Sequence, residues 1–262
     1  MIFNRKRIKQ WHIVMNMFLL ALSIWSLFPV AFLIAKAICK EEGAVLNNEF
    51  KNILLLSDTF HTAFRNSVCY AVVITIGQTL FGILMAFIFA KFKFRFREPL
   101  FYLLLLFMIL PTQTMLVQIY SAADRLSLID TFAGVVIPRI FLPIGIIFLR
   151  QYFVRVSDSV IEAAKIDGAS TINCLCSILL PIGKNGVFLL VFLAFIDSYN
   201  MYEIPLIILR NSAKVPMSVL IRAVVEKYPD EIFVPAILYM IPPVLLFSTL
   251  RDNLVNGMCY NE

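Results

Sequence analysis

The sequence predicts an all-α integral membrane protein, built as one domain with six transmembrane helices. Of its 262 residues, 60% are hydrophobic and only 15% are charged, and the mean hydropathy is +0.85. Soluble domains carry about a quarter charged residues, so this chain has too little polar surface to be soluble. Lys and Arg fall in short clusters between long uncharged runs, so the net charge of +6 indicates membrane topology and not nucleic-acid binding.

The first three spans are uncharged stretches long enough to cross a bilayer, which takes about 20 mostly apolar residues. They lie between Lys9 and Lys36, between Arg65 and Lys91, and between Glu98 and Asp124. The first follows basic residues, as a secretory signal does. Its apolar core exceeds the roughly 7 to 15 residues of a signal peptide, so we interpret it as a retained helix. We expect spans at about 11–36, 67–91 and 99–122.

The last three spans carry more polar residues. The fourth, at about 131–153, has Arg139 near its start and Arg150 near its end, where long side chains can reach the interface. The fifth, at about 182–209, is interrupted by three charged residues. The sixth, at about 232–251, has no charged residue before Arg251. The whole chain, residues 1–262, is therefore expected to form a single transmembrane domain.

Orientation follows from the basic residues in short loops. Four of them lie in the first ten residues, and four more crowd the connection between spans two and three. Such clusters favour the cytoplasmic side. With six spans, both termini and the loop at 157–181 are expected to face the cytoplasm.

The loop at 157–181 is too polar to lie in lipid and has the pattern of two short helices. Ser159 precedes Glu162 by three residues, a capping box that predicts a helix over 160–167. Asp167-Gly168 ends it. Ser170 or Thr171 can cap a second helix, which is expected to carry Ile172, Leu175 and Leu179 on one stripe and to end at Pro181.

This loop resembles a known motif. Glu162-Ala163-Ala164, then Gly168, then Ile178-Leu179-Leu180-Pro181, at this spacing, resembles the EAA loop of permease subunits of binding-protein-dependent ABC importers. The string 162–170 is similar to that of maltose-type carbohydrate permeases. Residues in other spans also match that family, namely Asn66-Ser67, Pro111, Asn200, Pro205-Leu206 and Pro242. The family often has Pro at Ser157 and Trp at Tyr199, so the match is not complete.

The resemblance implies a type I ABC importer permease fold, with cytoplasmic coupling helices that dock on an ATPase subunit. Carried over, the docking core would be Glu162, Ala163, Ala164 and Gly168. Its second half would be shaped by Asp167, Ile178, Leu180 and Pro181. The chain has no G-x-x-x-x-G-K-[S/T] phosphate loop, because its Gly183-Lys184 pair is followed by Asn185. It is therefore expected not to be an enzyme and to bind no cofactor, with ATP and Mg on the partner ATPase.

The partners implied by the resemblance are a second permease subunit in a heterodimer, two cytoplasmic ATPase subunits and an extracellular solute-binding protein. The chain would lie in a bacterial inner membrane and form the pathway for a sugar. One alternative is an ABC permease for another small solute. Another is a gradient-driven transporter or channel using Asp197 and Glu203. An intramembrane enzyme is disfavoured, because no paired His or nucleophile–base constellation is present.

Span five holds the candidate substrate-pathway residues. Asp197, Asn200 and Glu203 recur every three residues and so share one helix face. A carboxylate at membrane depth is costly unless it faces protein or water, which favours a pathway or an interhelix pair. Tyr199 could stack on a sugar ring. The alternative is that the carboxylates lie near the outer interface and Asn200 bonds a neighbouring helix. No metal site is expected, because the five Cys are scattered and only two His are present.

Overall fold

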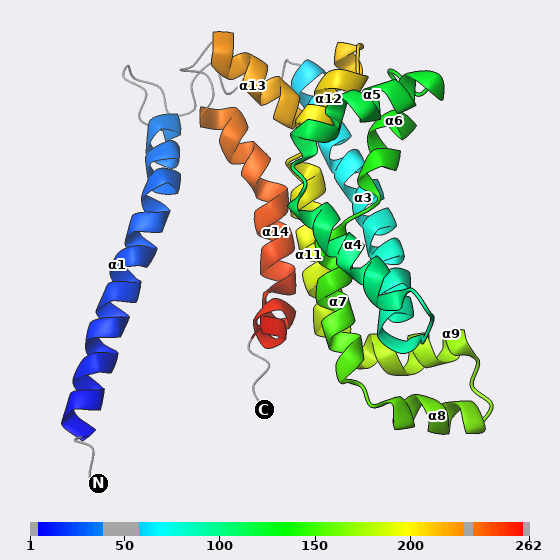
Figure 1. Cartoon of the computed structure of the whole chain (residues 1–262). Coiled ribbons are helices and arrows are strands. Elements are labelled where there is room, and N and C mark those ends of the chain that lie inside the picture. Colours follow the sequence, from blue (N-terminus) through cyan, green and yellow to red (C-terminus); the bar gives the residue numbers. More distant parts are fainter. Residues whose placement is uncertain (1–4, 39–57, 228–232, 259–262) are drawn as a thin grey trace.

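The computed structural model describes residues 5–38, 58–227 and 233–258, which form helices joined by short connections, with no strand among them (Figure 1). This confirms the predicted all-α class. The longer helices are α1 (Arg5–Ile38), α3 (Asp58–Lys91), α4 (Arg97–Ile109), α5 (Leu116–Arg125), α7 (Pro143–Arg155), α11 (Lys184–Tyr199), α13 (Met217–Lys227) and α14 (Phe233–Met258). The shorter ones are η1 (Thr112–Met115), α6 (Phe132–Val136), η2 (Ile137–Arg139), α8 (Asp158–Ile166), α9 (Thr171–Cys174), η3 (Leu175–Leu179), α10 (Leu180–Ile182), α12 (Glu203–Ile208) and η4 (Ser212–Lys214).

The core lies where α11 packs against α3, α7 and α14. Leu190 of α11 is buried there, between two glycines on neighbouring helices. A Cβ at Gly82 would lie 2.9 Å from Leu190 Cδ2, and one at Gly145 would also overlap that side chain. The glycines therefore let three helices approach closely around one leucine, the kind of small-residue contact that packs helices in membranes.

Among the described residues, two helices are by themselves long and apolar enough to cross a membrane, within α1 at Ile13–Lys36 and in α3. Three bent helix pairs, Arg97–Ile109 with Thr112–Arg125, Phe132–Arg139 with Pro143–Arg155, and Thr171–Ile182 with Lys184–Tyr199, bring the number to five if each pair is one span. The predicted sixth span falls on α14, which is not among those five, and its residue 232 lies outside the described residues. The number six stays a prediction.

The bends correct the expectation of continuous spans. The predicted span 99–122 breaks with a bend of 99°, because Pro111 lacks a backbone N–H and holds Leu110 extended, with ψ 123°. The predicted span 131–153 bends by 43° just before Pro143. The predicted span 182–209 starts at an 84° bend and divides into α11 and α12 at Asn200, where α11 ends.

The ends of the bundle sort as the predicted topology requires. The Arg5 end of α1, the Met258 end of α14 and helix α8 lie at one end of the molecule, which we call the loop end (Figure 1). Helices α12 and α13 lie at the opposite end, the far end. The start of the first span, the end of the last span and the 157–181 loop therefore lie on the same side. That this side is cytoplasmic stays a prediction.

The far end is held by polar contacts from α3. Asn66 Nδ2 donates to the carbonyls of Ala213 (2.9 Å) and Val215 (3.2 Å), and the N–H of Met217 donates to Ser67 Oγ (2.6 Å). Asn66-Ser67, which resembles the family at this position, thus anchors the chain that leads into α13.

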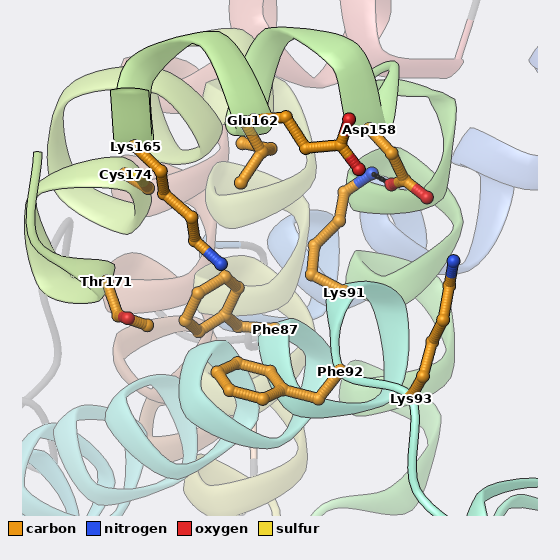
Figure 2. A pocket seen from close by; sticks show the side chains of 10 residues that line it. Phe87, Lys91, Phe92, Lys93, Asp158, Glu162, Lys165, Thr171 and Cys174 are labelled. Carbon is orange, nitrogen blue, oxygen red and sulfur yellow. Dashed lines mark hydrogen bonds and ion pairs between the residues drawn. The ribbon is translucent and has the colours of Figure 1, made fainter. Parts of the chain in front are cut away.

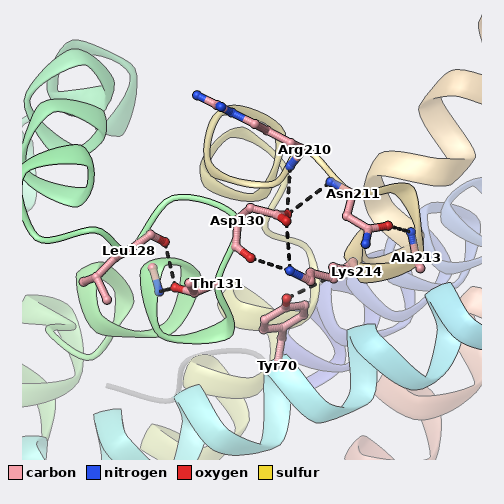
Figure 3. A network of polar contacts seen from close by, with 9 residues as sticks. Tyr70, Leu128, Asp130, Thr131, Arg210, Asn211, Ala213 and Lys214 are labelled. Carbon is pink, nitrogen blue, oxygen red and sulfur yellow. Dashed lines mark hydrogen bonds and ion pairs between the residues drawn. The ribbon is translucent and has the colours of Figure 1, made fainter.

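A second far-end contact centres on Asp130 (Figure 3). Its carboxylate accepts from Lys214 Nζ (2.9 Å) and from the backbone N–H groups of Arg210 and Asn211 (3.1 Å each). These bonds join the turn before α6 to the segment that follows α12.

Candidate functional site

The 157–181 loop begins with a capped helix at the loop end. Ser157 is the N-cap of α8, and its Oγ accepts from the N–H of Ser159 (3.3 Å). The prediction that Ser159 is the cap is wrong by two residues. The reason is that Ser157 has the extended backbone of a cap, with ψ 138°, whereas Ser159 already lies inside the helix.

Gly168 ends α8 as predicted. Its φ of +87° is a left-handed conformation that favours glycine. The N–H of Gly168 donates to Lys165 O (3.1 Å) and the N–H of Ala169 to Ala164 O (2.9 Å). This pair of bonds is a Schellman motif, which satisfies the last carbonyls of the helix and reverses the chain toward α9.

The second half of the loop runs back to the bundle. Ser170 caps α9, its Oγ accepting from the N–H of Asn173 (3.1 Å), as one of the two predicted caps. The chain then passes through a π-helical turn, η3, and α10 before it bends at Gly183. The helical run continues through Pro181 and ends at Ile182, one residue beyond the predicted end.

Four buried residues anchor the loop to the bundle. Ile161, Cys174, Leu175 and Leu179 belong to one apolar cluster with side chains of α3, α7 and α11. The predicted stripe is therefore correct for Leu175 and Leu179. It is wrong for Ile172, which lies in the first turn of α9 and is 71% exposed.

The predicted docking residues occupy two environments. Glu162, Ala163, Asp167, Gly168 and Pro181 are exposed, whereas Ala164, Ile178 and Leu180 are half-buried and pack against the apolar cluster just described. The structure also shows two residues that the motif did not mark. Ile166, the last residue of α8, is 86% exposed, and Ile172, in the first turn of α9, is 71% exposed. An apolar residue next to Asp167-Gly168 was the signal that could have found the first of them.

A pocket of about 300 Å³ opens between the end of α3 and the two loop helices (Figure 2). Phe87 and Phe92 form its floor with ring centroids 5.3 Å apart. Its polar lining comes from both sides of the loop connection, from Lys91, Lys93, Asp158, Glu162, Lys165 and Thr171. Among these charged groups, Lys91 of α3 and Asp158 of the loop form an ion pair above the two aromatic rings.

The predicted pathway residues do not form one lining. Asp197 pairs with Arg139, whose Nη2 donates to its Oδ2 and to its carbonyl (3.2 Å). Asp130, which is nearer to Arg139 in the sequence, pairs with Lys214. Glu203 accepts from Gln113 Nε2 (3.1 Å) near the far end.

Tyr199 and Asn200 both contact Tyr239 of α14. The Tyr199 ring is buried and stacks on Phe195 and Tyr239, with centroids 5.5 and 4.5 Å away. Tyr239 Oη donates to Tyr199 O (2.6 Å) and to Asn200 Oδ1 (3.2 Å). Asn200 is exposed and lines a pocket of about 400 Å³ between the α11–α12 connection, α13 and α14. In this conformation Asn200, and not Tyr199, offers polar atoms to a solute.

Comparison with known proteins places the chain in a family. Residues 78–258 match the family described as the binding-protein-dependent transport system inner membrane component. The chain belongs to this family. It is therefore a membrane permease component, and membership gives no support to the gradient-driven alternative.

Relatives and a solved structure agree with that assignment. The permease is 29% identical over 203 residues to the sn-glycerol-3-phosphate transport system permease protein UgpE of Agrobacterium fabrum, covering 75% of this chain and 72% of the relative. It is 24% identical over 214 residues to the arabinooligosaccharides transport system permease protein AraQ of Halalkalibacterium halodurans, covering 80% and 77%. Its fold matches a chain of a bacterial ABC transporter involved in the import of the acidic polysaccharide alginate, with TM-score 0.78 at 21% identity over 96% and 99% of the two chains.

Proposed function

We propose that the permease works in an ATP-driven importer and that its 157–181 loop docks on a cytoplasmic ATPase subunit. The observation that carries this proposal is the exposure of Ile166 and Ile172 on a loop whose other side is anchored in the bundle core. Apolar side chains exposed among polar residues are typical of surfaces that bind another protein when they form a patch, and we propose that Ile166 and Ile172 contribute to one. The loop is thus rigid on one side and available for a partner on the other.

ATP binding and hydrolysis belong to that partner, with Mg. Docking converts the closing of the ATPase into a rigid displacement of α8 and α9, which rocks the bundle between inward-facing and outward-facing states. The exposed Glu162 and Ala163 lie in the middle of α8, where the small Ala side chain permits close approach of a partner surface.

The remaining partners follow from the same assignment. A second permease, an extracellular binding protein and two ATPase subunits would complete the importer in a bacterial inner membrane, with both chain termini cytoplasmic. Support for a permease partner comes from α1, whose spanning segment Ile13–Lys36 has none of its residues buried and which packs on α14 within the described chain.

The transported solute is a carbohydrate or a related polyol. The names of the relatives support this, since they specify glycerol phosphate and arabinose oligosaccharides. Asn200 and the neighbouring pocket at the far end are the part of this chain that we assign to the pathway, and Tyr199 supports the pocket by stacking on Tyr239. Asp197 and Glu203 pair with Arg139 and Gln113 and do not line this pocket. Uptake of labelled sn-glycerol 3-phosphate and of arabinose oligosaccharides, compared between cells with the permease and cells lacking it, would identify the class of solute.

The docking proposal is tested with Ile166→Glu. The tagged permease is purified gently from its native membranes, and co-purifying ATPase and ATP hydrolysis are measured. We expect Ile166→Glu to lose most of both, because a charge replaces an apolar contact, while Ile166→Leu retains them. Leu126→Glu, the same kind of change at an exposed far-end position, is the matched control. Full ATPase retention by Ile166→Glu would contradict the proposal.

A further inference from the structure

Lys91, the last residue of α3, has a side chain that is largely covered by its neighbours. Its side chain is only 6% exposed, and its Nζ donates to Asp158 Oδ1 (2.9 Å) and to the carbonyl of Val156. Taking an ammonium group out of water is costly unless it is paired and hydrogen-bonded. The two acceptors meet that requirement. Figure 2 shows the bond to Asp158, at the start of the 157–181 loop, and Val156 is the residue just before that loop.

The two acceptors lie on either side of the connection that the loop depends on. Val156 is the C-cap of α7, and Asp158 is the first residue of α8. Val156 and Ser157 between these helices have extended backbone, with ψ of 123° and 138°. Lys91 bonds both ends of this extended connection to α3, next to the contact that buried Ile161 of α8 makes with the apolar cluster described above.

A second contact fixes the same turn of α3 to α7. Arg150 Nε donates to Phe89 O (3.1 Å), and its guanidinium lies 4.1 Å from the ring centroid of Phe101 on α4. The last turn of α3 is therefore bonded to α7 through Arg150 and to α8 through Lys91. The neighbouring Lys93 lines the same pocket and acts on Asp158 through its charge, without a hydrogen bond to it.

We propose that Lys91 is a positioning residue that makes α8 and α3 move together. When a partner displaces the 157–181 loop, the two bonds of Lys91 transmit the displacement to the end of α3 instead of allowing the connection at 156–158 to absorb it. Because α3 packs along α11 and α7, its movement reaches the core of the bundle. This inference rests on the proposed docking of an ATPase on the loop.

The test compares Lys91→Met, Lys91→Arg and Lys93→Met in the purified permease complex with its ATPase. Hydrogen–deuterium exchange is followed in two segments, the loop at 157–169 and the end of α3 at 84–95, with and without Mg-ATP trapped by vanadate. In the parent complex we expect trapping to change exchange in both segments. In Lys91→Met we expect the loop to respond and the α3 segment to lose its response.

The other variants separate positioning from general damage. Lys91→Arg keeps a donor for both acceptors and should restore the α3 response, and Lys93→Met should retain it. Asp158→Asn keeps the Val156 contact and loses the ion pair, so an intermediate response is expected; loss of a charged hydrogen bond corresponds to about a tenfold change in protection at the helix start.

Two outcomes would overturn different claims. An α3 response that persists in Lys91→Met, with the loop responding normally, would overturn the role of Lys91 and leave the docking proposal intact. Absence of an ATPase, or of any loop response in the parent complex, would overturn the proposed function instead. Should Lys91→Met fail to assemble, the comparison of Asp158→Asn with Lys91→Arg decides the question.

Discussion

Asp130 illustrates what a single residue contributes at the far end. It has a left-handed backbone, with φ 56°, which Asn and Asp adopt more readily than most residues. Lys214, and then the N–H groups of Asn211 and Arg210, lower the pKa of its carboxyl from 3.8 to about 2. The carboxylate is thus favoured by the folded chain, and Asp130 joins two segments that lie far apart in the sequence.

We expect Asp130→Asn to lower the melting temperature at pH 7, because it removes the ion pair with Lys214 while suiting the same backbone conformation. A lowered folded pKa means that the stabilisation is complete above pH 3.8 and is lost as the pH falls toward 2. The difference between variant and parent should therefore shrink over that range. Thermal unfolding in detergent at several pH values measures it, with Asp124→Asn as the control.

At the scale of elements, the loop is shaped by two glycines that act through different physics. Gly168 needs its positive φ, and a Cβ there would meet nothing within 4 Å. Gly183 has an ordinary φ of −87°, but a Cβ would lie 2.9 Å from Phe153 Cε1 and 3.0 Å from Leu179 O. The first glycine is required by backbone conformation, and the second by close packing at the 84° bend.

We expect Gly183→Ala to destabilise the permease by about 1–3 kcal/mol through overpacking. Phe153→Leu should relieve part of this cost, so that the two substitutions couple in a double-mutant cycle. Gly168→Ala should also destabilise, since its φ is unfavourable for Ala, but it should not couple to Phe153→Leu. Equal coupling for the two glycines, measured by thermal unfolding, would disprove this distinction.

At the scale of the whole molecule, a polar network ties three helices together inside the bundle. Gln78 of α3 donates to the carbonyl of Arg139 (2.6 Å), and Arg139 pairs with Asp197 of α11. Ser198 Oγ completes the network with Gln78 Oε1 (3.4 Å). The side chains of Arg139 and Asp197 are 15% and 40% exposed, so the pair is partly shielded from solvent.

We expect Arg139→Met and Asp197→Asn each to destabilise the permease by about 1–3 kcal/mol, because each leaves the other charge unpaired. The double variant should cost less than the sum of the two, since it leaves no unpaired charge. Apparent melting temperatures of the purified complex provide the measurement. Strict additivity would show that the two groups do not depend on each other.

The sequence alone determined the class of this protein and the location of its loop. Long uncharged runs predict membrane helices wherever they occur, because backbone groups in lipid must be bonded within the segment. Local signals were equally reliable where neighbouring residues decide the outcome, as at Gly168 and Ser170. Asp197 was correctly recognised as needing a polar environment, with an interhelix pair as one of the options.

Only the tertiary structure decided which residues meet. The partners of Lys91, Arg139 and Asp130 lie tens of residues away in the chain, and no local pattern encodes such contacts. The bend at Gly183 depends on packing, because a Cβ there would lie 2.9 Å from Phe153 of α7. Composition and short-range spacing therefore predicted the helices, whereas packing between helices determined their breaks, their ion pairs and the exposed face of the loop.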